Sequence, residues 1–257
     1  MNRPGPIDRR LGLLRSLLIY RAIPWRSAQL RRFYRRFVPP GGLAFDIGAH
    51  VGNRVSAFRA LGARVVAVEP QPDFVRLLQR RFGGDPNVTV LAHALGRAEG
   101  KAQLLASART PTVSTLSADF VQRAGASASF RGVQWAPGPV VAVDTLDALI
   151  ARHGRPDFVK IDVEAYELEV LMGLSEPLAA LSFEFLPALP EIALGCIDRL
   201  EALAAAARQR YRYAVSLGER LRLMQPEGVP ADAMRAWLEA LPVDAPSGDV
   251  HAWWAVD

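Results

Sequence analysis

The chain has 257 residues, of which 50% are hydrophobic and 22% are charged, with a net charge of +5 and one cysteine, Cys196. This length and composition are typical of a globular protein with one domain or two, and they exclude an intrinsically disordered chain. The single cysteine excludes an intrachain disulfide and argues against a cysteine-based zinc site, so a reducing, cytoplasmic location is expected. No uncharged apolar run reaches the ~18 residues that a membrane-spanning helix needs.

The positive charge is concentrated at the N-terminus, where residues 1–38 hold ten arginines and one acidic residue. We predict that residues 1–38 form a basic helical extension, with an amphipathic helix over 11–23 and a second helix over 25–38 that ends at the prolines and glycines of 39–42. Two interpretations of the first helix stay open: it packs on the main domain, or its arginine-rich face makes a peripheral contact with a membrane or a partner. Arginine in an alanine-rich sequence is typical of a GC-rich genome, so no nucleic-acid partner is predicted.

Residues 39–257 alternate between expected strands and expected helices. Apolar runs predict strands over 43–48, 64–69, 87–95, 157–162, 180–185, 213–217 and 249–256. Helical patterns follow over 55–61, 73–82, 164–174 and 191–209. This alternation predicts one doubly wound α/β domain, whose mostly parallel sheet is covered by helices on both faces.

Residues 97–145 interrupt this rhythm and are predicted to form an insert. They contain a short strand pair over 101–106 and 140–143, separated by a stretch rich in Ser, Thr, Ala and Gly. A long irregular segment within an α/β domain is typical of a lid or a binding loop, so we expect a lid or an acceptor loop here. Ser114 and Thr115 either face a ligand or are ordinary polar turn residues.

A glycine-containing loop follows the first expected strand, with the sequence Asp46-Ile-Gly48-Ala-His50-Val-Gly52. Glycine allows a sharp turn and a close approach of the backbone to a ligand. The loop lacks the middle glycine of the G-x-G-x-x-G dinucleotide motif, and it is not a P-loop. It therefore favours a ligand without a pyrophosphate, although a tight turn with no ligand stays an alternative.

Acidic residues mark the ends of the neighbouring strands. Glu69 ends the second strand, where a carboxylate can accept hydrogen bonds from both hydroxyls of a ribose. Asp162 and Glu184 end later strands, so they should lie near Asp46 and Glu69 in a negative cleft that suits a cationic sulfonium cofactor. Lys160 shares a strand face with Asp162 and is expected to pair with an acid, because a lone ammonium in an apolar strand is costly.

The stretches around these residues resemble the FkbM family of methyltransferases. The resembling segments are 45–52, 66–70, 94–96, 143–146, 159–167 (Val-Lys-Ile-Asp-Val-Glu-Ala-Tyr-Glu), 170–173, 182–185 and 247–250. The resemblance implies a Rossmann-like methyltransferase fold, a seven-stranded sheet whose last strand is antiparallel. It also implies methyl transfer from S-adenosylmethionine, usually to a hydroxyl oxygen of a sugar or natural product.

The family pattern also implies a set of cofactor-binding residues. Asp46, Gly48 and Gly52 would line the methionine end of the cofactor, Glu69 would hold the ribose, and His93 with Ala94 would border the adenine. We add the residues that flank these positions or end a neighbouring strand: His50, Asn53, Pro70, Gln71 and Asp162. The chain departs from the pattern at Ala165, where Gly is usual, and at His50, where Asn is usual.

Methylation of an alcohol requires proton removal as the oxygen attacks, so a base is needed. We predict that Asp162 and Glu164 supply this base or orient the acceptor, with Lys160 as the third residue of the catalytic group. Glu164 has an alternative role as a favourable charge at a helix N-terminus. No recognised ligand spacing supports a metal at Asp162, Glu164 and Glu184, and none is predicted.

The sequence thus favours an S-adenosylmethionine-dependent O-methyltransferase that acts on a hydroxyl of a sugar, glycan or secondary metabolite. One alternative is a non-catalytic S-adenosylmethionine-binding protein that joins an assembly through its basic helices. The other is a nicotinamide-dependent oxidoreductase, against which the missing glycine argues.

Overall fold

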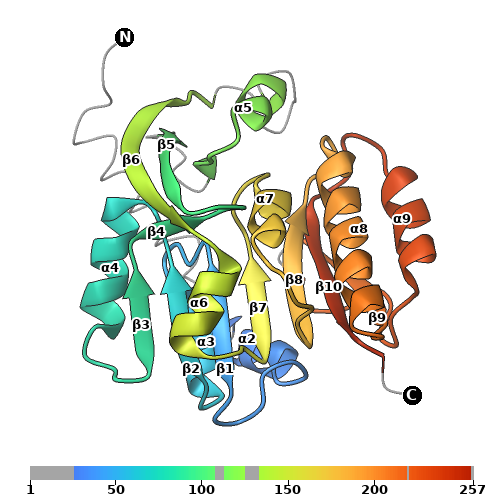
Figure 1. Cartoon of the computed structure of the whole chain (residues 1–257), viewed down its shortest axis with the longest axis horizontal. Coiled ribbons are helices and arrows are strands. Elements are labelled where there is room, and N and C mark those ends of the chain that lie inside the picture. Colours follow the sequence, from blue (N-terminus) through green and yellow to red (C-terminus); the bar gives the residue numbers. More distant parts are fainter. Residues whose placement is uncertain (1–25, 108–112, 125–132, 219, 256–257) are drawn as a thin grey trace.

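The computed structural model describes residues 26–107, 113–124, 133–218 and 220–255, and the helix expected over 11–23 lies outside these ranges. Figure 1 shows a central sheet between two layers of helices, with a smaller sheet above it. None of the helices in the described ranges is long and apolar enough to cross a membrane.

The central sheet has seven strands in the order β3-β2-β1-β7-β8-β10-β9. Their bounds are β1 (Leu43–Ile47), β2 (Arg64–Val68), β3 (Val88–Leu91), β7 (Phe158–Ile161), β8 (Ala180–Phe185), β9 (Tyr211–Leu217) and β10 (Gly248–Trp254). The pairs β1–β2, β2–β3, β1–β7 and β7–β8 are parallel, whereas β10 is antiparallel to both of its neighbours. The predicted doubly wound sheet with a reversed last strand is therefore confirmed.

Helices cover both faces of the sheet, and each face has its own core. On one face lie α2 (Arg26–Tyr34), α3 (Asn53–Ala60) and α4 (Pro72–Phe82), packed on residues such as Ala44, Ala67 and Phe158. On the other lie α6 (Leu146–His153), α7 (Glu167–Met172), α8 (Pro190–Ala206) and α9 (Ala231–Glu239), packed on Phe45, Ile161 and Phe183. Burial on both faces explains why these strands read as continuous apolar runs.

Two predicted elements differ in the structure. The single strand expected over 87–95 breaks at Ala92 into β3 and β4 (His93–Leu95), which belong to different sheets. An apolar run gives no sign of this break, because β4 is defined by its distant partner β6 (Ala136–Asp144). The helix expected over 164–174 begins only at Glu167, because Glu164 and Ala165 have positive φ angles of 56° and 68°.

The insert forms the predicted strand pair and adds structure that was not predicted. β5 (Gly100–Ala106) pairs antiparallel with β6, β4 completes a three-stranded sheet, and α5 (Ala118–Ala124) follows β5. Ala94, Leu104 and Val141 form its small core. Figure 1 shows this sheet and α5 above the carboxyl ends of the parallel strands, the edge where α/β sheets bind ligands.

Lys160 is fully buried on the central strand β7. Its Nζ lies 2.8 Å from Oδ1 of Asp249 on β10 and 3.3 Å from Oδ2 of Asp162, which confirms the expected pairing with an acid. Burial alone would lower the pKa of Lys160, but Asp162 and Asp249 outweigh it and raise the pKa. The ammonium is therefore charged within the sheet, and it connects β7 to β10 past β8.

Candidate functional site

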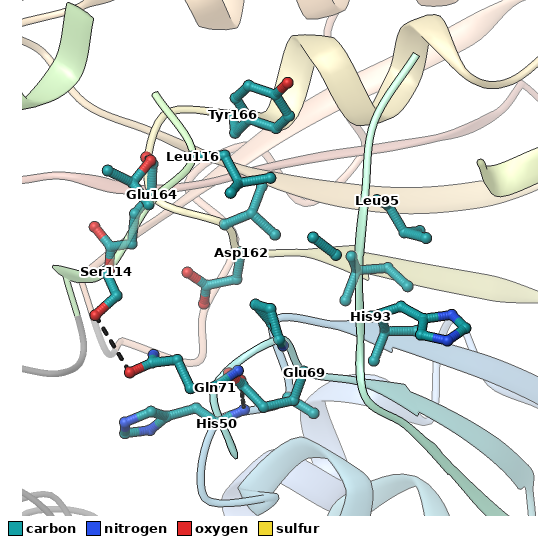
Figure 2. Close-up of a pocket in the computed structure, with 18 of the residues that line it drawn as sticks. His50, Glu69, Gln71, His93, Leu95, Ser114, Leu116, Asp162, Glu164 and Tyr166 are labelled. Carbon is teal, nitrogen blue, oxygen red and sulfur yellow. Dashed lines mark hydrogen bonds between the residues drawn. The ribbon is translucent and has the colours of Figure 1, made fainter. Parts of the chain in front are cut away.

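A pocket with about 880 Å³ of empty space, part of it open to solvent, lies at the carboxyl ends of β1, β2 and β7. The predicted cofactor residues that line it are Gly48, His50, Asn53, Glu69, Pro70, Gln71, His93, Ala94 and Asp162, and Glu164 lines it as well. Figure 2 shows residues from these segments, among them Glu69, Asp162 and Glu164, arranged around one space. Asp46, Gly52 and Lys160 do not line the pocket.

The glycine loop is shaped by the close approach of two strand ends. Gly48 has a φ of +83°, and a Cβ atom there would clash with the backbone oxygen of Asp162. Gly52 has a φ of +78°, and a Cβ atom would clash with Phe82 and Leu78. His50 has a φ of 49°, a conformation in which Asn is enriched, which accounts for the Asn that the family pattern has here.

Glu69 is held rigidly in the pocket wall. It is 3% exposed, its Oε2 accepts a hydrogen bond from the backbone N–H of His50 at 2.9 Å, and its Oε1 accepts one from that of Gln71 at 2.9 Å. Burial raises the pKa of Glu69 to about 7, against the lowering effect of these two bonds. A carboxylate fixed in this way can accept hydrogen bonds from the two hydroxyls of a ribose.

The glycine loop also contains a buried acid, Asp46, and an uncharged histidine, His50. Asp46 is 1% exposed, and its oxygens accept no hydrogen bond of normal geometry from the described residues. Burial raises the pKa of Asp46 to about 6 and lowers that of His50 to about 4. At neutral pH the side chain of His50 therefore adds no positive charge to the pocket.

Asp162 stays ionised although it is partly buried. Its Oδ2 lies 3.3 Å from Nζ of Lys160 and 3.5 Å from Arg54. Burial alone would raise the pKa of Asp162, but the charges of Lys160 and Arg54 outweigh it and hold the pKa below its ordinary value. Asp162 therefore presents a negative charge to the pocket at neutral pH.

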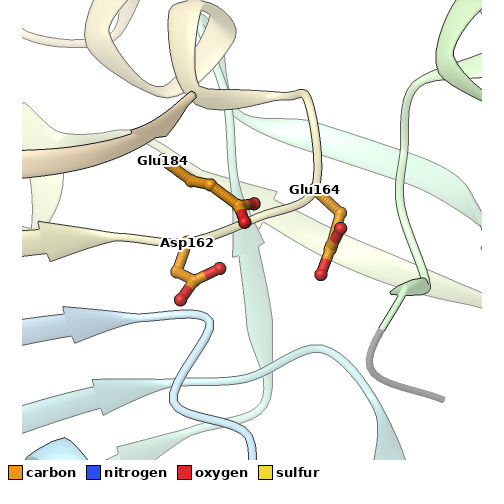
Figure 3. A group of neighbouring side chains, drawn as sticks. All are labelled: Asp162, Glu164 and Glu184. Carbon is orange, nitrogen blue, oxygen red and sulfur yellow. The ribbon is translucent and has the colours of Figure 1, made fainter. Parts of the chain in front are cut away.

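Two further carboxylates gather around Asp162. Atoms of Asp162, Glu164 and Glu184 all lie within 4.8 Å of one another, and Figure 3 shows the three groups facing a common point. Burial raises the pKa of Glu164, and the charge of Asp162 raises it further. Burial likewise raises the pKa of Glu184, with Glu164 as the next cause. A cluster of this size allows its carboxylates to share protons, and it could also hold a hard cation.

The backbone around Glu164 is strained. Glu164 and Ala165 are successive non-glycine residues in the left-handed region, each at a cost of roughly 1–2 kcal/mol. The Thr115 hydroxyl donates a hydrogen bond to the Glu164 carbonyl oxygen at 2.6 Å, and Oε1 of Glu167 accepts one from the Val163 N–H at 3.0 Å. A glycine at position 165 would adopt this conformation freely, whereas the Cβ atom of Ala165 makes it costly.

Several pocket residues were missed or left open by the sequence. Arg54 and Tyr166 line the pocket, as do Ser114, Thr115 and Leu116 of the insert. Arg54 was detectable in principle, because it lies in the first turn of the helix after the glycine loop. The insert residues were not detectable, because the periodicity and spacing of a sequence do not indicate which distant strand ends a loop will cover.

We predict that Glu164→Gly is more stable than Glu164→Ala by about 1 kcal/mol, because glycine adopts the left-handed backbone without a Cβ penalty. The measurement is urea unfolding of both variants. Glu169 in α7 is the matched control: there, Gly should be less stable than Ala by about 1 kcal/mol. The same order of stability at both positions would contradict the strain at Glu164.

Solved structures that resemble the chain include precorrin-6y C5,15-methyltransferase from Geobacter metallireducens, with 12% identity, 90% of this chain and 86% of that chain covered, and a TM-score of 0.46. Another is an O-methyltransferase from Bacillus cereus in complex with SAH, with 14% identity, 98% and 92% covered, and a TM-score of 0.42.

Among curated proteins, none matches the chain. The family model named methyltransferase FkbM domain matches residues 46–238, about three quarters of the sequence. This span includes the glycine loop, Glu69 and the three clustered carboxylates. The chain therefore belongs to the FkbM methyltransferase family.

Proposed function

We propose that the protein transfers a methyl group from S-adenosylmethionine to a hydroxyl oxygen of a neutral acceptor, such as a sugar, a glycan or a secondary metabolite. The observation that carries this proposal is one pocket lined both by Glu69, which suits a ribose, and by Asp162 and Glu164, which suit an alcohol. The insert contributes Leu104, Ser114 and Leu116 to the pocket wall, and we propose that it forms part of the acceptor site.

The residues present fit this cofactor. The carboxylate of Glu69, which the backbone N–H groups of His50 and Gln71 fix in the pocket wall, suits the ribose hydroxyls. His93 and Ala94 would border the adenine, as the family pattern implies. When bound, S-adenosylmethionine would supply a methyl group on a positively charged sulfur, which the negative site favours.

The two carboxylates that face the acceptor have different tasks in this proposal. Asp162, ionised beside Lys160 and Arg54, accepts a hydrogen bond from the acceptor hydroxyl and orients it. Glu164, whose pKa burial raises, is the stronger base when ionised, and it takes the hydroxyl proton as the new carbon–oxygen bond forms. Lys160 does not reach the pocket, so its part is to hold Asp162 charged and in place.

The charge of the site limits the class of acceptor. Asp162, whose pKa is held low, and Glu164 line this side of the pocket with Glu184 close to both, and Lys160 and Arg54 are already paired with Asp162. An acceptor with a carboxylate or phosphate near the reacting atom would be repelled. A neutral hydroxyl compound meets no such barrier and can donate hydrogen bonds to the carboxylates.

Thermal unfolding with S-adenosylmethionine, S-adenosylhomocysteine or NAD tests the cofactor, and methyl transfer to a panel of hydroxyl acceptors tests the reaction. We expect dose-dependent stabilisation by the two adenosyl compounds, about 2.7 kcal/mol at a hundredfold excess over the dissociation constant, and none by NAD. Stabilisation by NAD alone would favour an oxidoreductase. Binding without turnover on any acceptor would favour a non-catalytic protein.

Asp162→Asn should lower kcat about a hundredfold or more while it changes the affinity for S-adenosylhomocysteine much less, because the lost charge faces the acceptor. Steady-state kinetics and calorimetric titration measure the two effects. Asp244→Asn, a substitution at an exposed position, is the control and should change neither. If Asp162→Asn left both kcat and affinity intact, the assignment of Asp162 would be wrong.

The affinity for S-adenosylhomocysteine should fall about fourfold between pH 8 and pH 6.5. Only the ionised carboxylate of Glu69 accepts hydrogen bonds from both ribose hydroxyls, and its pKa of about 7 means that it gains a proton over this range. Binding is therefore strongest above the pKa and weakens below it. Glu69→Gln should bind more weakly and without this pH dependence, whereas Glu99→Gln should behave like the wild type. An unchanged slope in Glu69→Gln would contradict the role of Glu69.

A further inference from the structure

Residues 113–117 of the insert, which we call the strap, are anchored on β5 and extend over the pocket. Leu105 and Thr115 exchange two backbone hydrogen bonds, of 2.8 and 3.0 Å, and the indole N–H of Trp135 donates one to the Val113 carbonyl oxygen at 2.7 Å. Thr115 is 1% exposed, so its side chain points into the protein. Hydrogen bonds therefore hold the strap in place, and it forms part of the pocket wall.

The hydroxyl of Thr115 uses its hydrogen-bonding capacity on two backbone groups. It donates to the Glu164 carbonyl oxygen at 2.6 Å and accepts from the Ser117 N–H at 2.9 Å. The first bond crosses from the insert to the loop after β7, 49 residues further along the chain. Figure 2 places Ser114 of the strap beside Glu164, on the same side of the pocket.

The hydrogen bond from Thr115 to Glu164 restrains a strained part of the backbone. Glu164 and Ala165 both have positive φ angles, which side chains with a Cβ atom rarely adopt without outside contacts. Thr115 supplies one such contact, and the insert supplies a second through Phe120, which packs with Ala165 and Leu189. The conformation of Glu164 therefore depends on a segment that is remote in sequence.

The left-handed backbone determines where the Glu164 carboxylate lies. In this conformation it meets Asp162 and Glu184 within 4.8 Å at the pocket wall, whereas a right-handed or extended backbone would turn it in another direction. We infer that Thr115 is a positioning residue for methyl transfer, whose hydroxyl holds Glu164 in the backbone conformation that aims its carboxylate at the acceptor. The inference rests on the proposed function.

The first test needs no turnover. Hydrogen–deuterium exchange of peptides that span residues 162–167 should rise about tenfold in Thr115→Val, because a buried carbonyl loses its partner and the loop opens more often. Thr115→Ser keeps the hydroxyl and should exchange like the wild type. The matched control is Thr145→Val, which removes a hydroxyl that caps α6 by accepting from the Ala148 N–H at 3.1 Å, and it should leave this loop unchanged.

The second test asks whether Thr115 acts through Glu164. Thr115→Val should lower kcat ten- to hundredfold while the affinity for S-adenosylhomocysteine changes less than about threefold, and Thr115→Ser should restore kcat to within about threefold. In a Glu164→Gln background, Thr115→Val should lower kcat by less than about threefold further, because the group that it positions is already lost.

Three outcomes would overturn the inference. These are unchanged exchange in Thr115→Val, equal losses for Thr115→Val and Thr115→Ser, or an undiminished effect of Thr115→Val in the Glu164→Gln background. Failure of the proposed function looks different. The wild type would then methylate no acceptor, while the exchange pattern would still show whether Thr115 holds the loop.

Discussion

A buried ammonium organises the edge of the sheet at which the pocket lies. Lys160, on the central strand β7, is shared by Asp162 in front of it and Asp249 on the antiparallel strand β10. Loss of one partner from such a pair costs about 3–5 kcal/mol, because the remaining charge stays buried. The pairing therefore keeps Asp162 ionised beside two other carboxyl groups, and it links the reversed strand β10 to the negative charge at the pocket.

The three carboxylates at this edge are chemically similar but behave differently because of their surroundings. Asp162 has two cations within 3.5 Å, which outweigh the effect of burial on its pKa. Within the described residues, neither Glu164 nor Glu184 forms an ion pair, and burial together with neighbouring acids raises their pKa values and favours their protonated forms. Environment thus separates a fixed negative charge at Asp162 from two carboxyl groups that hold a proton more tightly, and a carboxylate of raised pKa is the stronger base once it is ionised.

The site is also held together by contacts between segments far apart in the chain. Gly48 lets the end of β1 approach the backbone of Asp162, the backbone N–H groups of His50 and Gln71 fix Glu69, and Thr115 of the insert reaches Glu164. Each of these contacts restrains a group that faces the pocket. The strain at Glu164 is tolerated because the insert and α7 both bond the same short loop.

The sequence by itself determined the doubly wound sheet, the glycine loop and the acids at the strand ends, because these follow from local patterns of apolar residues and glycine. It also indicated the pairing of Lys160, since an ammonium in an apolar strand requires a partner. Only the tertiary structure decided that this partner includes Asp249, that 87–95 divides between two sheets, and that Arg54 and the strap line the pocket. These features depend on contacts between residues many positions apart, and the periodicity of a single segment carries no information about which distant segment will pack against it.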